Sequence, residues 1–334
     1  MKMKKALALV LAALLLVSMA ACTGTAPAAT TAAAAETTAA AEAEASEASA
    51  ETESGKTYTV GICQLVQHPA LDAATQGFKD ALTEALGDAV SFNEQNASGE
   101  SVNCATIVNG LVASQVDLIL ANATAPLQAA ASATADIPVL GTAVTDYASA
   151  LEIDNWTGTV GGNISGTSDL APLDQQAAML QELFPDAKTV GLLYCSAESN
   201  SKYQVDMIRG YLEQAGLTCE EYAFTDTSDV IYIPTDNTAA SNTEAIANVV
   251  LPAGVPVIAG EEGICQGCGV ATLSISYYDL GYATGKMAVK ILTGEADIST
   301  MPVEYAPQVT KKYNAANCET LGVTVPDDYA AIEG

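Results

Sequence analysis

The chain has 334 residues, of which 40 are acidic and only 12 are lysine or arginine, so its formal net charge is −28 at pH 7. This charge argues against binding of nucleic acid, because a polyanion would be repelled from so acidic a surface. Arg209 is the only arginine, and an arginine fork is therefore not expected to hold a ligand carboxylate. An anionic group would instead depend on backbone N–H groups, hydroxyls or a helix N-terminus.

The first 21 residues have the three-part pattern of a secretory signal peptide. Three lysines within the first five residues are followed by an apolar stretch, Ala6–Val17, that is too short to span a bilayer, and then by the small residues that a signal peptidase requires. We therefore predict that residues 1–21 are removed. Cys22 comes next in a pattern that resembles a bacterial lipobox, and this resemblance implies that Cys22 is lipidated. The alternative is an ordinary secretory signal with an incidental cysteine.

Residues 22–55 are predicted to form a disordered tether behind the lipidated cysteine. Beyond Cys22 they are almost only Ala, Thr, Glu, Ser and Pro, without an aromatic or basic residue, and cannot bury enough apolar surface to offset the entropy of ordering. No later apolar run approaches the roughly 20 residues of a transmembrane helix. We expect an extracytoplasmic protein that is lipid-anchored to the bacterial cell membrane and does not span it.

Seven further cysteines follow Cys22 in the sequence. Cys265 and Cys268 have the spacing of a zinc knuckle or a redox pair, but a zinc site needs a second such pair or histidines, and His68 is the only histidine. We therefore predict neither a metal nor a cofactor. A local disulfide between these two cysteines stays open beside free structural thiols in a reducing or anaerobic habitat.

The globular part, from Lys56 onward, begins with an alternation of strands and helices. Short β-branched apolar runs occur at 57–63, 90–92, 116–121 and 137–141. Segments with helical periodicity separate them, at 70–86, at 101–114 and from Pro126 onward. This alternation predicts a parallel sheet that is covered by crossover helices.

A second series of the same kind follows. We predict strands at 189–195, 219–224, 230–234, 255–259 and 270–275, and a late return strand at 303–308. The predicted helices are 175–184, 201–215, 243–250 and 278–292. The fold class is therefore α/β, with two similar doubly wound lobes and a ligand cleft between them.

One connection in the second lobe is shorter than its counterpart in the first. A helix-sized stretch separates the strands at 90–92 and 116–121, whereas only residues 225–230 separate 219–224 from Ile231. Parallel strands in one sheet need a crossover of about a dozen residues or more. We predict that one crossover helix of the second lobe is missing, which would put Thr235 to Asn237 out of place. The alternative is that 219–224 pairs antiparallel or is not a strand.

Polar residues follow nearly every predicted strand, where ligands bind in such sheets. Each residue alone can equally be a helix cap. Their recurrence predicts a binding cleft. Its candidate polar residues are Gln64, His68, Thr124, Thr145, Asp146, Ser196, Glu198, Asn200, Thr235, Asp236, Asn237 and Glu261.

Five short segments carry a resemblance to a known family. The residues at 67–72, 143–146, 161–166, 234–237 and 277–281 resemble those of the substrate-binding lipoproteins of ABC importers, in the branch associated with tryptophan and tyrosine uptake. The resemblance implies a type I periplasmic-binding-protein fold whose lobes are joined by three crossing segments and close by hinge motion. It divides the chain into an N-lobe of 56–166 plus 277–300 and a C-lobe of 167–276 plus 301–334.

The resemblance also implies a ligand and partners. The ligand would be a free amino acid, in particular an aromatic one, and the partners would be the permease and ATPase subunits of the importer. Thr124 and Thr145 would receive the ligand carboxylate, and Asp236, or failing that Asp146, would pair with the ammonium group. Candidates for the slot that holds the ring are Leu65, His68 and Tyr203.

Other classes of function are weighed against this one. An enzyme is not predicted, because the sequence has neither a Gly-x-Ser-x-Gly elbow nor a phosphate loop, and a lone histidine leaves a serine triad only one candidate base. The same fold also serves as the ligand-sensing ectodomain of a signalling system and as a binder of other small solutes, such as sugars or nucleosides. These two alternatives remain open at the level of the sequence.

Overall fold

The computed structural model describes residues 55–221, 228–306 and 308–333. The predicted signal peptide, Cys22 and nearly all of the predicted tether lie outside the described residues, as does half of the short link at 225–230. Within the described part of the chain, no helix combines the length and the apolar character needed to cross a membrane.

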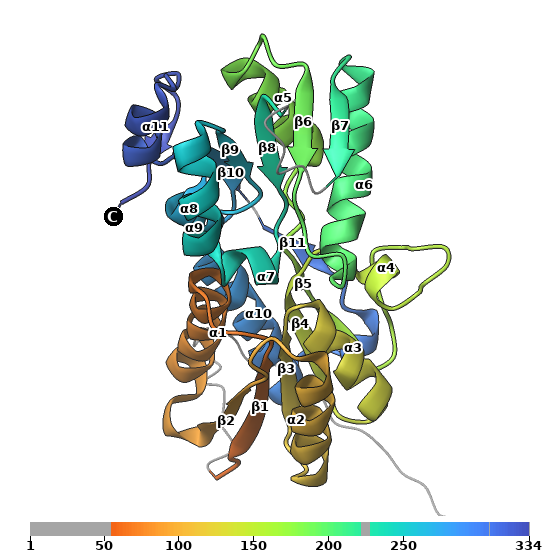
Figure 1. Cartoon of the computed structure of the whole chain (residues 1–334). Coiled ribbons are helices and arrows are strands. Elements are labelled where there is room, and N and C mark those ends of the chain that lie inside the picture. Colours follow the sequence, from red (N-terminus) through yellow and green to blue (C-terminus); the bar gives the residue numbers. More distant parts are fainter. Residues whose placement is uncertain (1–54, 222–227, 307, 334) are drawn as a thin grey trace, which may run out of the picture. The chain divides into compact units, whose positions relative to one another are not determined.

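The first sheet has six strands in the order β11-β5-β4-β3-β1-β2, and all of its pairs are parallel. Helices follow the strands as the periodicity predicts (Figure 1). The elements of this first half of the chain are β1 (Tyr58–Gln64), α1 (Pro69–Leu86), β2 (Val90–Asn96), α2 (Ser101–Ala113), β3 (Leu118–Asn122), α3 (Thr124–Ala133), β4 (Val139–Val144), α4 (Tyr147–Ala150) and β5 (Ile164–Ser168).

The second sheet has seven strands in the order β13-β12-β10-β9-β8-β6-β7, parallel except for the pair of β10 and β12. Its elements are α5 (Leu173–Leu183), β6 (Thr189–Leu192), α6 (Ser199–Gln214), β7 (Thr218–Glu221), β8 (Val230–Ile233), α7 (Asn237–Ala240), α8 (Thr243–Ala253), β9 (Val257–Ala259), α9 (Glu262–Cys268), β10 (Ala271–Ser274), β12 (Thr310–Tyr313), α11 (Ala315–Leu321) and β13 (Ala330–Ala331). Two elements return to the first sheet, α10 (Tyr277–Leu292) and β11 (Glu304–Tyr305).

The two sheets repeat one arrangement, as the predicted pair of similar lobes requires. β1 lies between β2 and β3, and β6 lies in the same way between β7 and β8, with parallel pairing on both sides. The alternative that 219–224 pairs antiparallel is therefore wrong. Because β6 separates β7 from β8, these two strands are also not neighbours. The predicted loss of a crossover helix between them stays a prediction, because residues 222–227 are outside the described part.

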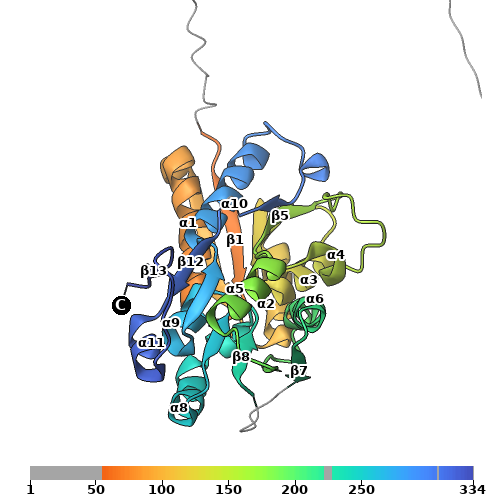
Figure 2. The same ribbon diagram turned by 90° about the horizontal axis from the view of Figure 1, so that it is seen from above.

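Helix α10 completes the core of the first sheet, although it follows β10 of the second sheet in sequence. It packs beside α1 (Figure 1, Figure 2), and the two helices cover apolar side chains of β1, β3 and β4. The contact is close because glycines face it. A Cβ atom added at Gly281 would lie 1.9 Å from the carbonyl oxygen of Ala74, and one added at Gly77 would lie 2.1 Å from that of Tyr278.

The chain passes between the two sheets three times, as the resemblance implies. The passages run from β5 to α5, from β10 to α10, and from β11 to β12. β11 pairs with β5 in the first sheet, whereas the predicted division counts 301–334 with the C-lobe. The exact lobe boundaries therefore remain a prediction, and the passages themselves position the residues of the candidate site.

Candidate functional site

A small cavity lies where the carboxyl ends of strands from both sheets meet. Its empty space is about 280 Å³, of which about 10 Å³ can be reached by the centre of a water-sized sphere. That is room for roughly one water molecule. Thirteen residues line it: His68, Ala70, Leu71, Ala143, Thr145, Asp169, Asn200, Thr235, Asp236, Asn237, Ala240, Glu261 and Tyr277.

Half of the candidate polar and ring-slot residues line this cavity, and several of them come within two residues of the end of a strand. Thr145 follows β4, Thr235 follows β8, and Glu261 follows β9. Because all of these strands are parallel, their polar ends converge at the facing edges of the two sheets. The predicted residues that the cavity brings together are His68, Thr145, Asn200, Thr235, Asp236, Asn237 and Glu261.

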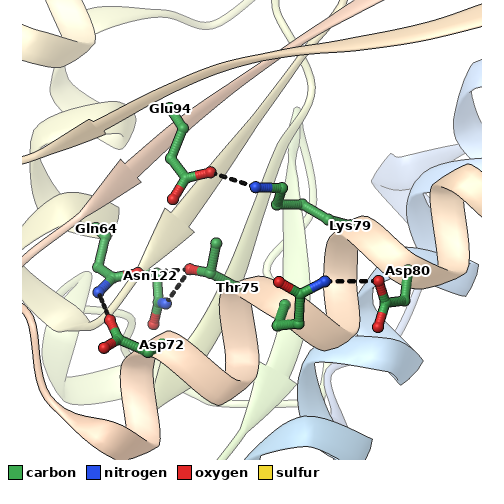
Figure 3. A network of polar contacts seen from close by, with 8 residues as sticks. Gln64, Asp72, Thr75, Lys79, Asp80, Glu94 and Asn122 are labelled. Carbon is green, nitrogen blue, oxygen red and sulfur yellow. Dashed lines mark hydrogen bonds and ion pairs between the residues drawn. The ribbon is translucent and has the colours of Figure 1, made fainter.

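Gln64, which is also predicted to bind the ligand, is committed to internal contacts instead. Its amide nitrogen donates to Asp72 Oδ1 at 2.6 Å, and its amide oxygen accepts from the Thr75 hydroxyl at 2.6 Å. The same hydroxyl accepts from Asn122 Nδ2 at 2.9 Å, so that β1, β3 and α1 are joined in one network (Figure 3). The network fixes the start of α1, and with it the position of His68.

Glu198 and Asp146 serve as acceptors for short helices. Glu198 accepts from the main-chain N–H groups of Asn237 and Thr238, at 3.1 and 2.8 Å, and thereby holds the start of α7. Asp146 caps α4 by accepting from the Ser149 N–H at 2.7 Å. Both residues lie beside the cavity-lining segments without lining the cavity themselves.

The remaining predicted residues also lie elsewhere in the described part of the chain. Leu65 is buried in the core of the first sheet, and Thr124 is buried as the first residue of α3. Ser196 is exposed, and Tyr203 lies half-buried on α6. The proposed carboxylate site at Thr124 and the ring slot at Leu65 and Tyr203 are thus not part of this cavity.

Two polar residues of the cavity are not among those that the sequence predicts, Asp169 and Tyr277. Asp169 directly follows β5, which lacks a β-branched run and was not recognised as a strand. The rule that polar residues follow strands would have found Asp169 once β5 was identified. Tyr277 is the first residue of α10, and its hydroxyl donates to Asp169 Oδ2 at 2.9 Å.

Three buried carboxyl groups line the cavity, and they differ in their partners. Asp236 accepts from the N–H groups of Cys195 and Ala239, at 2.6 and 2.7 Å, one on each oxygen. Glu261 likewise accepts from Gly263 N–H at 2.7 Å on one oxygen and from Ile264 N–H on the other. Asp169 receives the Tyr277 hydroxyl on Oδ2, and its Oδ1 has no partner among the described residues.

Burial dominates the electrostatics of the cavity. It raises the pKa of Asp169 and of Asp236, and it raises the pKa of Glu261 to about 7. Within the described part of the chain, neither lysine nor arginine lines the cavity. Burial also lowers the pKa of His68. The cavity therefore holds acidic groups without a cationic side chain to offset them.

No group of three or more potential metal ligands occurs among the residues that the structure describes. Cys265 and Cys268, considered above as a disulfide, are free and buried, as is Cys318. Burial raises the pKa of the Cys268 thiol to about 12. These thiols belong to the interior of the second half of the chain and not to the cavity.

Comparison with known proteins agrees with this geometry. The family model described as "ABC transporter substrate binding protein" matches residues 59–332. A protein of Clostridioides difficile named "Tyrosine-binding protein" is 35% identical over 269 residues, which are 76% of this chain and 77% of that protein.

Solved structures are similar over most of the chain. The ABC domain of Streptococcus pneumoniae in complex with L-Trp superposes with a TM-score of 0.77 at 35% identity, covering 81% of this chain and 97% of that one. A ligand-free, open substrate-binding protein of Clostridium difficile gives a TM-score of 0.66 at 35% identity, covering 83% and 99%. The type I periplasmic-binding-protein fold is thereby confirmed. Since the family model spans almost the whole globular part, the chain belongs to the substrate-binding proteins of ABC transporters.

Proposed function

We propose that this protein is the solute-binding component of an ABC importer and that it binds a free aromatic amino acid in the cavity between the two sheets. Members of the family act outside the cytoplasm and work with permease and ATPase subunits. One observation carries the choice of ligand: buried carboxyl groups line the cavity, and no described lysine or arginine accompanies them. Such a site suits a ligand that brings its own positive charge.

The relatives support an aromatic side chain. One is named a tyrosine-binding protein, and the structure of another contains L-Trp. In this chain the ring would lie among the apolar lining residues Ala70, Leu71, Ala143 and Ala240. The ligand carboxylate would be received by hydroxyl and main-chain donors, among which Thr145 is the first candidate.

We further propose that the ligand enters by opening of the two halves. The cavity has room for roughly one water molecule in the present conformation, so an amino acid can neither enter nor be accommodated unless the two halves move apart. Two contacts would hold the closed state, from His68 Nε2 to Asn237 Oδ1 at 3.2 Å and from Gln204 Nε2 to Thr145 Oγ1 at 3.5 Å. The higher TM-score against the tryptophan complex than against the open structure supports a closed arrangement.

Anchoring belongs to the same proposal. Cys22 would carry the lipid and residues 23–55 would form the tether that lets the binding domain search near the permease. The predicted N-lobe and C-lobe would rotate about the three passages between the sheets.

The test is thermal unfolding of the chain from residue 22 with Cys22→Ser, which keeps the protein in solution. Tyrosine, tryptophan and phenylalanine are compared with glucose and adenosine as solutes of other classes. A ligand present at 100 times its dissociation constant adds about 2.7 kcal/mol to the stability, which is readily seen. Binding of a sugar or nucleoside, with no response to the three aromatic amino acids, would overturn the proposal.

A further inference from the structure

Two of the residues that line the cavity carry a buried polar atom without a hydrogen-bond partner. Five such side-chain atoms occur among the described residues, and the two at the cavity are His68 Nδ1 and Asp169 Oδ1. His68 is 7% exposed and Asp169 is 3% exposed. A buried polar atom without a partner is costly, so a group that satisfies both atoms would be bound with a considerable gain.

Both atoms are hydrogen-bond acceptors, as the surrounding contacts show. Asn237 Nδ2 donates to Glu198 Oε2 at 2.8 Å, so the other end of this amide, Oδ1, faces His68. An amide oxygen can only accept, and His68 Nε2 must therefore carry the hydrogen. In the neutral imidazole this leaves Nδ1 as a bare acceptor. Asp169 Oδ1 is an acceptor whenever its carboxyl group is ionised.

Asp169 differs in this respect from the other two carboxyl groups of the cavity. Both oxygens of Asp236 and both oxygens of Glu261 already accept main-chain N–H groups, which fix the starts of α7 and α9. An incoming cation would have to share those oxygens. Asp169 alone among the three has an oxygen that lacks a hydrogen-bond partner among the described residues.

We propose that Asp169, and not Asp236, pairs with the ammonium group of the ligand, which donates to Asp169 Oδ1 and to His68 Nδ1. The inference rests on the proposed function, because it assumes a ligand with a primary ammonium group. Such a group has three donors and can serve two acceptors at once, and both acceptor residues line the same cavity. Asp236, which sequence reasoning favoured for this role, is then a positioning residue that holds α7 in place.

Asp169 and its partner Tyr277 lie at segments that connect the two halves of the protein. Asp169 lies in the passage from β5 to α5, and Tyr277 is the first residue of α10, where the passage from β10 ends. The ammonium group would thus be bound at the segments about which the two halves turn. His68 completes the contact from the start of α1, and the same ring bonds to Asn237 of the second half.

The experiment measures two ligands on three variants by calorimetry. The ligands are L-tyrosine and 3-(4-hydroxyphenyl)propanoic acid, which has hydrogen in place of the amino group. Asp169→Asn should lose at least about 30-fold in affinity for tyrosine and less than about threefold for the analogue. Asp236→Asn should keep the preference for tyrosine. The exposed Asp174→Asn on α5 is the matched control and should stay within about twofold for both ligands.

The outcomes separate this inference from the proposed function. If the wild-type protein binds tyrosine but Asp169→Asn keeps the same preference over the analogue, Asp169 does not hold the ammonium group and the two acceptors serve a buried water instead. If the preference for tyrosine disappears in Asp236→Asn, Asp236 holds the ammonium group and the assignment to Asp169 is wrong. A wild-type protein that binds none of the three aromatic amino acids would overturn both proposals.

The inference can be tested even if Asp169→Asn does not fold. Circular dichroism and thermal unfolding establish whether Asp169→Asn is native. If it is not, the wild-type protein decides through its two ligands, because equal affinity for tyrosine and the analogue would overturn the inference. His68→Phe is a second variant, and it should weaken tyrosine binding by about three- to tenfold through loss of one neutral acceptor.

Discussion

The contact between α1 and α10 leads to a sharp prediction about Gly281. Alanine at this position would put its Cβ atom 1.9 Å from the oxygen and 2.6 Å from the carbon of the Ala74 carbonyl group. Main-chain atoms cannot rotate away, and an ordinary contact of 3.4 Å would need a local separation of the helices by about 1.5 Å. Overpacking costs up to about 3 kcal/mol, and better helix propensity recovers about 0.5–1 kcal/mol. We expect Gly281→Ala to lose about 2 kcal/mol of unfolding free energy.

Gly210→Ala is the matched control for this change. Gly210 lies inside α6, and no heavy atom lies within 4 Å of the place that its Cβ would take. The same substitution should therefore stabilise the protein by about 0.5–1 kcal/mol. Urea unfolding at pH 7, followed by circular dichroism, measures both variants under identical conditions. If Gly281→Ala proves as stabilising as Gly210→Ala, the close approach of α1 and α10 is refuted.

Four further predictions concern acidity, capping, anchoring and the short link. Burial raises the pKa of Glu261 from 4.5 to about 7 in the folded protein. The contribution of Glu261 to the free energy of unfolding is therefore fully present below pH 4.5, and it declines by about 3 kcal/mol as the pH rises through 7. Urea unfolding at pH 5 and pH 8 should show this decline, and Glu261→Gln should flatten it. Asp236→Ala should cost about 1–2 kcal/mol of stability through loss of the α7 cap, without removing the preference for tyrosine over its deaminated analogue. Cys22→Ser should move the protein from membranes to the soluble fraction at unchanged affinity, and a variant that still sediments with membranes would contradict the anchor. Hydrogen exchange should be faster in Val230–Ile233 than in Leu118–Asn122 if the short link weakens the second half, whereas equal protection would contradict this.

The order of strands and helices could be predicted well because burial leaves a regular pattern in the sequence. Helix α1 is an example: Leu71, Ala74, Phe78 and Leu82 recur at helical spacing and are all buried. β5 could not be predicted in this way. Its sequence, Ile-Ser-Gly-Thr-Ser, has only one large apolar residue. Its central glycine lies against β4, since a Cβ atom at Gly166 would lie 2.1 Å from the carbonyl oxygen of Gly141.

The candidate site could be predicted only in part, for a different reason. The position of a residue after a strand indicates where its main chain lies, but not which partner its side chain takes. Gln64 accepts a hydrogen bond from Thr75, and Glu198 accepts one from Thr238. Both partners depend on the tertiary arrangement, which the sequence pattern does not contain. Asp169 could not be predicted as a site residue, because it follows β5, and the sequence pattern does not identify β5 as a strand. The neighbourhood of the site was therefore accessible from the sequence, whereas the roles of single residues were not.

The return of α10 to the first sheet bears on how the protein is made. Side chains of β1, β3 and β4, such as Val60, Ile62 and Leu120, are covered by a helix that is synthesised about 200 residues after β1. The first sheet therefore has no complete core while the ribosome is still producing the middle of the chain. A nascent chain without its own stable unit stays unfolded for longer and is open to export factors. Premature termination before residue 277 would leave part of an apolar sheet face uncovered, and we expect such fragments to be degraded or to aggregate.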